Sequence, residues 1–357
     1  MSIHTYFFEL IFRERILFSL AILIAILFLF TVVFGVYAVF LRIANERKRA
    51  HWEQLETAWE QEVLEVLAGE HRPDQLWRRV NKKDALYFVD FLLRYAQRLR
   101  GQERDILTEL ARPYLRQIAR RMKEGDATQR ARAAQTLSAL GLFDYALELI
   151  AALDDPSPLV AMIAARALAR KEHPQFAVPV LDRLHRFRSW SRNYLASMLA
   201  AVGSEITPAL RNALADPNRS ARTRSVSAEA LLELNDFAAA DTAARILETE
   251  TDRDLLASCL RLLAQVGRIE HLSSVRRLCG SSDFVVRAHA VRALGSLGGA
   301  EDYDNVLQAF EDPSQWVAIH AAWALKDVGG LDDLKEIAGS DHPRADLARQ
   351  VLTEEGS

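Results

Sequence analysis

Cysteine is scarce in this sequence, and the two that occur exclude two kinds of fold. Cys259 and Cys279 are the only cysteines among 357 residues, and they do not form a CxxC pair. A disulfide scaffold and a cysteine-based zinc site are therefore excluded. The chain also lacks a Gly-rich phosphate loop, and beyond residue 41 it lacks the alternating apolar and polar runs typical of strands. These absences predict an all-α protein.

An excess of positive charge is also absent, which argues against a general nucleic-acid binder. The formal net charge is -3. Residues 133–357 carry 23 basic and 31 acidic side chains, so the positive groove that nucleic acid needs is not expected there. The balance varies along the chain: residues 42–132 have 20 basic and 15 acidic residues, whereas residues 301–357 have 4 and 13. We therefore predict a protein partner and no nucleic acid.

One long apolar run stands near the N-terminus. Residues 16–41 contain no charged side chain. A helix of this length reaches roughly 39 Å, more than the roughly 30 Å hydrocarbon core of a bilayer. The apolar part of a signal peptide is shorter, about 7–15 residues. We therefore predict a single transmembrane helix at 16–41, after an N-terminal segment at 1–15.

The basic residues around this run predict its orientation. Two arginines, Arg13 and Arg15, precede it, and four basic residues, Arg42, Arg47, Lys48 and Arg49, follow it. Positive residues are enriched on the cytoplasmic side of membrane proteins. The expected location is the inner (cytoplasmic) membrane, with a single pass and the C-terminal body in the cytoplasm.

The region at 42–125 predicts a helical, membrane-proximal part. Trp52, Leu55, Trp59, Val63 and Val66 recur at three- and four-residue steps, as on one face of a helix over 43–68. Two further helices are expected at 84–100 and 103–123, and the dipeptide at 72–73 is interpreted as a break before them. This region does not fit the repeat that follows it.

Seven leucines, the ladder leucines, recur at steps of 31 or 32 residues over 126–352: Leu137, Leu168, Leu199, Leu231, Leu263, Leu294 and Leu325. Four residues after each leucine stands Gly or Asn in most repeats, which predicts a left-handed helix end. Asp126, Asp155, Asp216, Asp283 and Asp312 are expected to begin the helices that carry the leucines. A helix pair of this size cannot bury its apolar face alone, so about seven stacked repeats and a truncated cap are predicted.

The repeats have a recognisable pattern. Residues 155–168 read DPSPLVAMIAARAL and residues 312–325 read DPSQWVAIHAAWAL. This pattern resembles the HEAT repeat, in the short variety called phycobilisome-lyase-like HEAT. The resemblance implies an all-α solenoid of stacked helix pairs, preceded here by the predicted transmembrane helix. It is weak evidence for function, because such repeats occur in scaffolds, adaptors and a few enzymes.

The resemblance also bears on metal chemistry. Iron-dependent hydroxylases built on HEAT repeats bind their metal through His-Glu dipeptides, and this sequence has only the reverse order, at 70–71, 172–173 and 270–271. His289 and His320 occupy equivalent places in neighbouring repeats; a metal site or a pH sensor is one interpretation, and a duplicated surface row is the preferred one. No activated nucleophile is indicated. We expect no enzyme activity, no catalytic residue, no metal and no cofactor.

Two sets of residues were considered as binding surfaces. Four arginines stand seven residues before a ladder leucine: Arg130, Arg192, Arg224 and Arg287. Binding of phosphates or of an acidic partner is one interpretation, and pairing with the Asp at a helix start, which would join adjacent repeats, is the preferred one. The aromatic set is the better candidate, since Trp, Tyr and Arg dominate protein-binding hot spots. The predicted partner-binding residues, for which packing between repeats is the alternative, are Trp190, Tyr194, Arg261, Arg292, Trp316, His320 and Trp323, together with Arg166 in the register of Trp323.

These patterns predict a non-catalytic, membrane-anchored scaffold or adaptor that holds a membrane-associated protein partner in the solenoid groove. By resemblance, it would be an accessory subunit of a larger membrane system, such as envelope-polymer or exopolysaccharide synthesis. The alternative, which rests on kinship alone, is a repeat-based enzyme such as a chromophore lyase or a metal-dependent hydroxylase.

Overall fold

The computed structural model describes residues 3–354, with side chains at 27–43, 46–47 and 49–354, and every regular element in this range is helical. The chain divides into two compact units, Met1–Leu110 and Ala111–Ser357. The prediction of an all-α protein is confirmed for the described residues.

The first unit is built on one long helix. Helix α1 (Ile3–Leu67) is followed by α2 (Pro73–Arg79), α3 (Ala85–Ala96) and α4 (Gln102–Glu124), which continues into the second unit. The ring of Trp59 lies 5.1 Å from that of Phe88 and 5.9 Å from that of Phe91, so the C-terminal part of α1 forms an aromatic core with α3. Residues 72–73 do separate α1 from the helices that follow, and the structure adds the short helix α2, which begins at Pro73, a position where the missing N–H of proline leaves no hydrogen bond unmade.

The apolar side chains in the predicted span of α1 are exposed over the part of this segment whose side chains the structure describes. The large hydrophobic side chains between Leu27 and Ile43 are 41–73% exposed. No helix among the described residues has both the length and the apolar composition needed to cross a membrane. Part of the predicted span, residues 16–26, lies outside the residues whose side chains are described.

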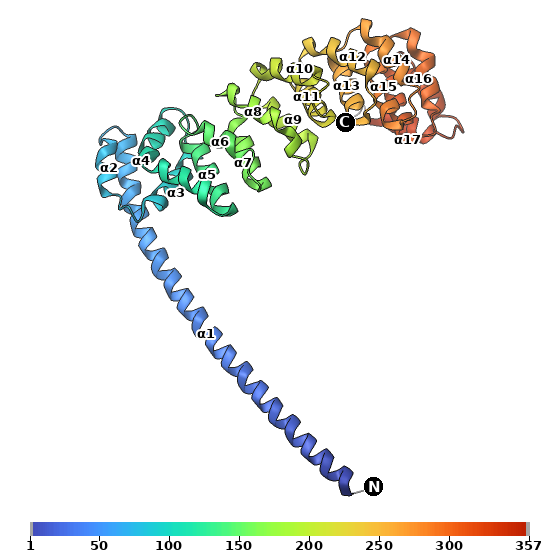
Figure 1. The fold of residues 1–357 in the computed structure, drawn as a ribbon. Coiled ribbons are helices and arrows are strands. Elements are labelled where there is room, and N and C mark those ends of the chain that lie inside the picture. Colours follow the sequence, from blue (N-terminus) through green and yellow to red (C-terminus); the bar gives the residue numbers. More distant parts are fainter. Residues whose placement is uncertain (1–2, 355–357) are drawn as a thin grey trace. The chain divides into compact units, whose positions relative to one another are not determined.

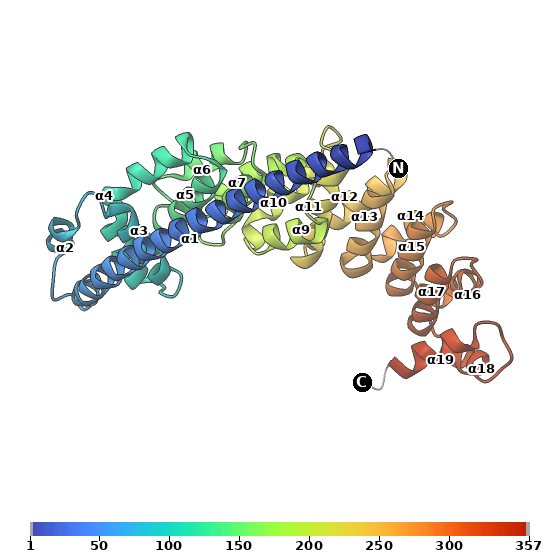
Figure 2. The ribbon, with the colours of Figure 1, turned by 90° about the horizontal axis from the view of Figure 1, so that it is seen from below.

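The second unit consists of helix pairs that follow one another in chain order (Figures 1 and 2). What we call the second helices carry the ladder leucines or, in the last case, close the array: α5 (Ala127–Leu140), α7 (Pro158–Leu168), α9 (Arg192–Ala200), α11 (Ala221–Glu233), α13 (Arg253–Val266), α15 (Phe284–Leu297), α17 (Gln315–Asp327) and α19 (Ala345–Thr353). The first helices alternate with them: α6 (Ala146–Ala152), α8 (Val178–Asp182), α10 (Thr207–Ala215), α12 (Ala240–Thr249), α14 (Leu272–Leu278), α16 (Tyr303–Phe310) and α18 (Leu331–Ala338).

The ladder leucines form the centre of this unit. All seven lie on second helices and are fully buried. Each helix pair therefore completes its apolar core with the next pair, as stacked repeats do. Close packing joins α5 to α7, and a second unbroken series joins α9 to α19 through α11, α13, α15 and α17.

The close packing is interrupted between α7 and α9 (Figure 1). At this repeat the position three residues after the ladder leucine is Lys171, where the other repeats have an apolar residue. Lys171 and Glu172 are both exposed, and the connection to α9 contains the short helix α8 and a 3-10 turn at Leu184–Arg186. A charged residue in place of an apolar one removes part of the surface on which the next repeat would stack.

The prediction of left-handed helix ends is confirmed at three positions and wrong at three others. Gly203, Asn235 and Gly329 have positive φ angles of 97°, 52° and 98°. Gly141, Gly267 and Gly298 have negative φ, so they are not left-handed. At Gly267 a Cβ atom would lie 2.4 Å from the carbonyl oxygen of Leu263, and the glycine is needed there for close approach.

The aspartates begin the second helices in two ways. Asp126 and Asp283 are N-caps, as predicted, with side chains that accept hydrogen bonds from backbone N–H groups of the first turn. At Asp155, Asp216 and Asp312 the prediction was wrong in detail. Their side chains accept from the N–H two residues later, at 2.8, 3.0 and 2.8 Å, and the N-cap is a serine, Ser157, Ser220 or Ser314. An Asp followed by Pro closes a turn before the helix instead of capping it.

A buried glycine provides a test of the stacking. A Cβ atom on Gly295 of α15 would lie 2.5 Å from the Cβ of Ala324 on α17. Gly→Ala within an exposed helix normally stabilises by about 1 kcal/mol. We expect the opposite sign for Gly295→Ala, a lower urea midpoint by circular dichroism, because α15 and α17 must move apart. The neighbouring exposed Ser296→Ala is the control; an equal or higher midpoint for Gly295→Ala would contradict the close packing.

Candidate functional site

The face formed by the second helices holds two kinds of arginine, and the first kind joins neighbouring repeats. Arg130 donates to both carboxylate oxygens of Asp155 at 2.7 and 2.9 Å, and Arg287 donates to Asp312 at the same two distances. These hydrogen bonds lower the pKa of Asp155 and Asp312. The predicted structural role is confirmed for both arginines.

The pairing follows a rule that can be read from the repeat register. The acidic partner stands thirteen residues before the ladder leucine of the following repeat. Glu250 occupies this place for Arg224, which donates to it at 2.8 Å. Two repeats have another residue in place of the arginine, Ala161 in one and Leu256 in the other. Their partner positions hold Arg186 and Ser281, respectively, so neither of these positions has a carboxylate that would lack its arginine.

Arg192 is the exception, and the prediction for it was wrong. Its partner position holds Asn218, which carries no charge. Nη1 of Arg192 instead lies 2.9 Å from the carboxylate of Asp254 on α13, two second helices away. The same Nη1 is buried and has no hydrogen-bond partner among the described residues, so the ion pair is poorly aligned. Arg192 therefore lies along the second-helix face and does not join two neighbouring repeats.

Arg222 of α11 and Arg261 of α13 continue the line from Arg192. Arg222 donates to the backbone carbonyls of Phe187 and Trp190, and its pKa is lowered by burial and by the nearby charges of Arg192 and Arg188. Burial and Arg192 also lower the pKa of Arg261. The Nε atoms of Arg222 and Arg261 are buried without a hydrogen-bond partner in the described part of the chain.

One buried carboxylate accompanies Arg261. Glu229 of α11 accepts a hydrogen bond from Arg261 and another from the hydroxyl of Ser258, the latter at 2.6 Å. Sequence reasoning placed Arg261 in the site but missed Arg188, Arg192, Arg222 and Glu229 as members of the same surface. The signal was present, because Arg222 shares the register of Trp190 and Trp316 and Glu229 shares that of Arg261.

The predicted aromatic residues fall into two groups at opposite ends of this line. Trp190 and Tyr194, at the start of α9, stack with ring centroids 5.2 Å apart. Trp316 and His320 of α17 meet edge to face at 5.0 Å. Trp316 is 52% exposed, and Trp190 and Tyr194 are partly exposed. The structure therefore does not bring the predicted residues into one cluster, since α11, α13 and α15 lie between the two groups.

The two histidines adjoin each other, with ring centroids 6.0 Å apart. Burial, Arg261 and His320 lower the pKa of His289 to about 4, and burial and Arg292 lower that of His320. Both ring nitrogens of His320 are buried without a hydrogen-bond partner among the described residues. At neutral pH His289 is uncharged, and the adjacent arginines make this place unfavourable for a cation.

The remaining predicted residues differ in exposure. Trp323 is partly buried, and the ammonium group of Lys326 lies 4.9 Å from its ring centroid. Arg292 is exposed and makes no ion pair within the described residues. Arg166 is also exposed, but it lies on α7, beyond the interruption of the packing. Arg166 therefore does not belong to the continuous face that runs from α9 to α17.

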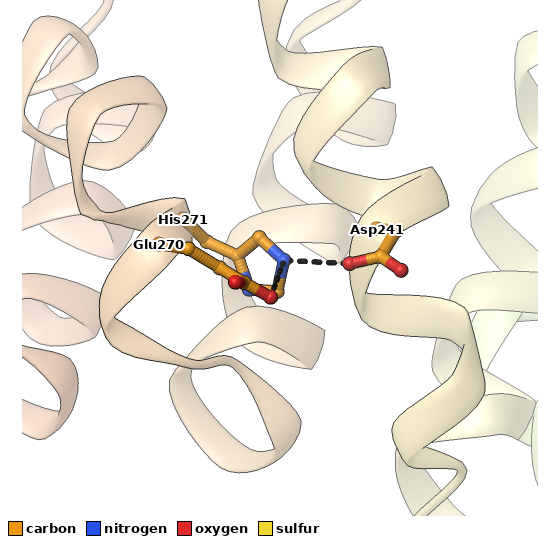
Figure 3. Close-up of side chains that lie close together, drawn as sticks. All are labelled: Asp241, Glu270 and His271. Carbon is orange, nitrogen blue, oxygen red and sulfur yellow. Dashed lines mark hydrogen bonds and ion pairs between the residues drawn. The ribbon is translucent and has the colours of Figure 1, made fainter.

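A separate cluster on the first-helix side has the composition of a metal site. Asp241, Glu270 and His271 place ligand atoms within 4.8 Å of one another (Figure 3). Nδ1 of His271 accepts a hydrogen bond from the N–H of Arg268 at 3.0 Å, so Nε2 of the neutral ring carries the proton and donates to Asp241 at 2.9 Å. Neither ring nitrogen is then free to bind a metal, and the guanidinium of Arg268 already pairs with both carboxylates. The cluster instead joins the start of α14, at His271, to Asp241 of α12.

The two cysteines do not offer a nucleophile. Burial raises the pKa of both thiols to about 12. A thiol that stays protonated at neutral pH is a poor nucleophile and a poor metal ligand. Cys259 and Cys279 are therefore packing residues.

The paired aspartates provide a test that depends on pH. Asp312→Asn removes the charge that Arg287 binds, and we expect it to lower the free energy of unfolding by roughly 1.5–3 kcal/mol at neutral pH. Because the folded-state pKa of Asp312 lies below the unfolded value, this stabilisation is present at neutral pH and is lost as the pH falls below about 4. Urea titrations at several pH values measure it. Exposed Asp327→Asn is the control, and a difference that grows at low pH would contradict the assignment.

Part of the second unit matches a known repeat family. Residues 244–326 and 275–353 match the family model of HEAT repeats, and no curated protein matches the chain. The complex of CpcE and CpcF of phycocyanin lyase from Nostoc sp. is 18% identical, with a TM-score of 0.34, over 68% of this chain and 88% of that chain. The karyopherin Kap121p bound to the extreme C-terminus of the protein phosphatase Cdc14p is 14% identical, with a TM-score of 0.40, over 70% of this chain and 34% of the karyopherin. The second unit is an all-α array of stacked helix pairs, and its residues 244–353 match HEAT repeats.

Proposed function

We propose that this protein is a non-catalytic, membrane-anchored scaffold that binds a protein partner on the second-helix face from α9 to α17. The observation that carries the proposal is Trp316, which is 52% exposed at one end of a face whose other end carries the Trp190–Tyr194 pair. Large, rigid aromatic side chains with part of their surface open to solvent are typical anchors of protein interfaces. Stacked repeats provide the extended surface that such binding uses.

The chemistry of the described side chains supports a binding role. Both thiols are held in the protonated form by burial, and His289 is uncharged at neutral pH. The His271 imidazole is engaged at both nitrogens. None of these groups is positioned as a nucleophile with an adjacent base, which is the arrangement that covalent catalysis needs.

We propose further that residues 16–41 anchor the scaffold in the inner membrane, with the second unit in the cytoplasm. The uncharged run in the sequence and the exposed apolar side chains between Leu27 and Ile43 support this. Apolar surface of this extent is rarely left open to water in monomeric soluble proteins. A membrane-associated partner then follows from the location, and an accessory role in an envelope-polymer or exopolysaccharide system would suit it.

The partner proposal is tested by recovery from detergent-solubilised membranes. We expect the tagged full-length chain to recover a stoichiometric protein, and we expect Trp316→Ala with Trp323→Ala to reduce that recovery at least about tenfold, since a hot-spot residue contributes about 2 kcal/mol or more. Phe237→Ala is the control, because Phe237 is 68% exposed but lies on the first-helix side. Unchanged recovery by the double variant, or one equivalent of iron or zinc bound through His289 and His320, would contradict the proposal.

The anchor proposal is tested by fractionation and by topology. We expect the full-length chain to sediment with membranes and to resist extraction at alkaline pH, because a spanning helix is held by the bilayer itself. Replacing Leu27, Phe30 and Phe34 by Lys is expected to release the protein, whereas Lys at the already polar Thr31 alone is not. A C-terminal reporter that is active only in the cytoplasm gives the orientation. Release of the unaltered chain by alkaline extraction would disprove the anchor.

A further inference from the structure

The buried polar atoms that lack a hydrogen-bond partner are gathered on one surface. Within the described residues these atoms are Nη1 of Arg192, Nε of Arg222, Nε of Arg261 and both ring nitrogens of His320. The four residues lie on α9, α11, α13 and α17, and all are on the second-helix face. Buried polar groups in folded proteins are almost always paired, so a cluster of exceptions on a single face needs an explanation.

The arginines of this face form a continuous line, which we call the cationic row and define as Arg188, Arg192, Arg222, Arg261 and Arg292. Three observations connect its members. Arg222 reaches back to the carbonyl of Trp190, beside Arg192. Arg192 reaches forward to Asp254 on the helix that carries Arg261. His289 of α15 and His320 of α17 have ring centroids 6.0 Å apart and extend the line to these two helices, and Arg292 also lies on α15.

The row has more positive than negative charge. Two carboxylates pair with its arginines: Glu229, which Arg261 and Ser258 bind, and Asp254, which Arg192 shares with Arg253. A third, Glu233 of α11, accepts a hydrogen bond from Ser197 of α9. Arg188 and Arg292 are exposed and have no carboxylate partner among the described residues. The excess is notable because the whole chain has a net charge of -3. The sequence predicts no positive groove here from the charge of residues 133–357 taken together. A total over 225 residues does not reveal five arginines that lie near one another in the fold.

We propose that the cationic row binds an acidic segment of the protein partner, extended across α9 to α17. This inference rests on the proposed function and specifies the partner's chemistry. Carboxylates of the segment would pair with the exposed Arg188 and Arg292 and with the partly exposed guanidinium groups of Arg222 and Arg261. Its apolar side chains would contact Trp190 at one end and Trp316 at the other. A guanidinium that is already partly desolvated forms a strong hydrogen bond with a carboxylate.

The spacing of the helices specifies the segment further. Packed helices lie about 8–10 Å apart, and an extended chain advances about 3.3 Å per residue. One helix step therefore corresponds to about three residues of the segment. An acidic residue at about every third position would meet one member of the row at each step. A single nucleic-acid strand in a duplex carries a phosphate about every 3.4 Å, so most of its charges would find no cation here.

The experiment uses a peptide of known sequence as the probe. A fluorescein-labelled peptide of about 15 residues carries Glu at every third position, with Ser and Gly between, and a second peptide has Lys in place of Glu. Binding to the purified full-length chain is measured by anisotropy at roughly 50 mM salt, where screening is weak. We expect the Glu peptide to bind and the Lys peptide not to bind. Arg188→Glu with Arg292→Glu is expected to weaken binding at least about tenfold, because charge reversal replaces attraction by repulsion.

The control is Arg120→Glu, which reverses an exposed arginine of α4 that has no ion pair among the described residues. Arg188 and Arg292 are exposed and unpaired, so the double variant is expected to keep its unfolding midpoint. Equal weakening by Arg120→Glu, or no binding of the Glu peptide, would overturn the proposal. Tighter binding of single-stranded oligo(dT) or of anionic vesicles, or self-association that the double variant abolishes, would assign the row to another occupant and would also overturn it.

The same variant separates this inference from the proposed function. If the double arginine variant recovers the membrane partner as well as the unaltered chain does, while Trp316→Ala with Trp323→Ala does not, the scaffold role stands and the acidic segment is wrong. If neither variant changes recovery, the second-helix face is not the binding surface, and both proposals fail.

Discussion

Burial of one leucine per repeat is the constraint on which the second unit depends. Each ladder leucine is fully buried, and it is covered by residues of its own helix pair together with those of the next. Fully burying a leucine contributes about 1.5–3 kcal/mol relative to exposure, and no single pair encloses enough apolar surface to fold alone. The regular spacing of the helices, and therefore the continuity of the face from α9 to α17, follows from this stacking.

The arginines show how one residue type serves two purposes on this scaffold. An arginine seven residues before the ladder leucine joins two repeats when the following repeat supplies Asp or Glu at the partner position. Asn218 removes that partner for Arg192, and the side chain then belongs to the open face. One arginine of the cationic row is thus on this face because position 218 holds an uncharged residue. The cost is a guanidinium with an unsatisfied, buried N–H group.

The fold was largely predictable from the sequence because the signals that determine it are local and repeated. The spacing of the leucines, the Asp residues near helix starts and the absence of alternating runs all indicate stacked helix pairs. The glycines at helix ends were harder, because the same residue serves a left-handed turn at Gly203 and close approach at Gly267, and only the neighbouring repeat distinguishes the two. The short helix α2 was missed because a proline that ends one helix can also begin the next.

The candidate site was only partly predictable. Register aligned Trp190 with Trp316 and Tyr194 with His320, and the same ring contact recurs in the two repeats, between Trp190 and Tyr194 and between Trp316 and His320. Register alone does not tell which arginine has an acidic partner, since that depends on contacts between residues 25 to 62 positions apart. Net charge was misleading for the same reason, because residues 301–357, with 13 acidic and 4 basic side chains, offset the arginines of the other helices in the total. The local excess on the second-helix face is a property of three-dimensional neighbours.

The interruption between α7 and α9 has a consequence for cooperativity. In a linear array each repeat is stabilised by its neighbours. A change in the stability of one repeat therefore affects a distant repeat only through an unbroken series of interfaces. Here the series stops after α7 and starts again at α9. The second helices from α9 to α19 therefore form one unbroken packed series, and the cationic row begins at Arg188, just before its first helix. The stacking that spaces the arginines on this face is supplied by interfaces on one side of the interruption.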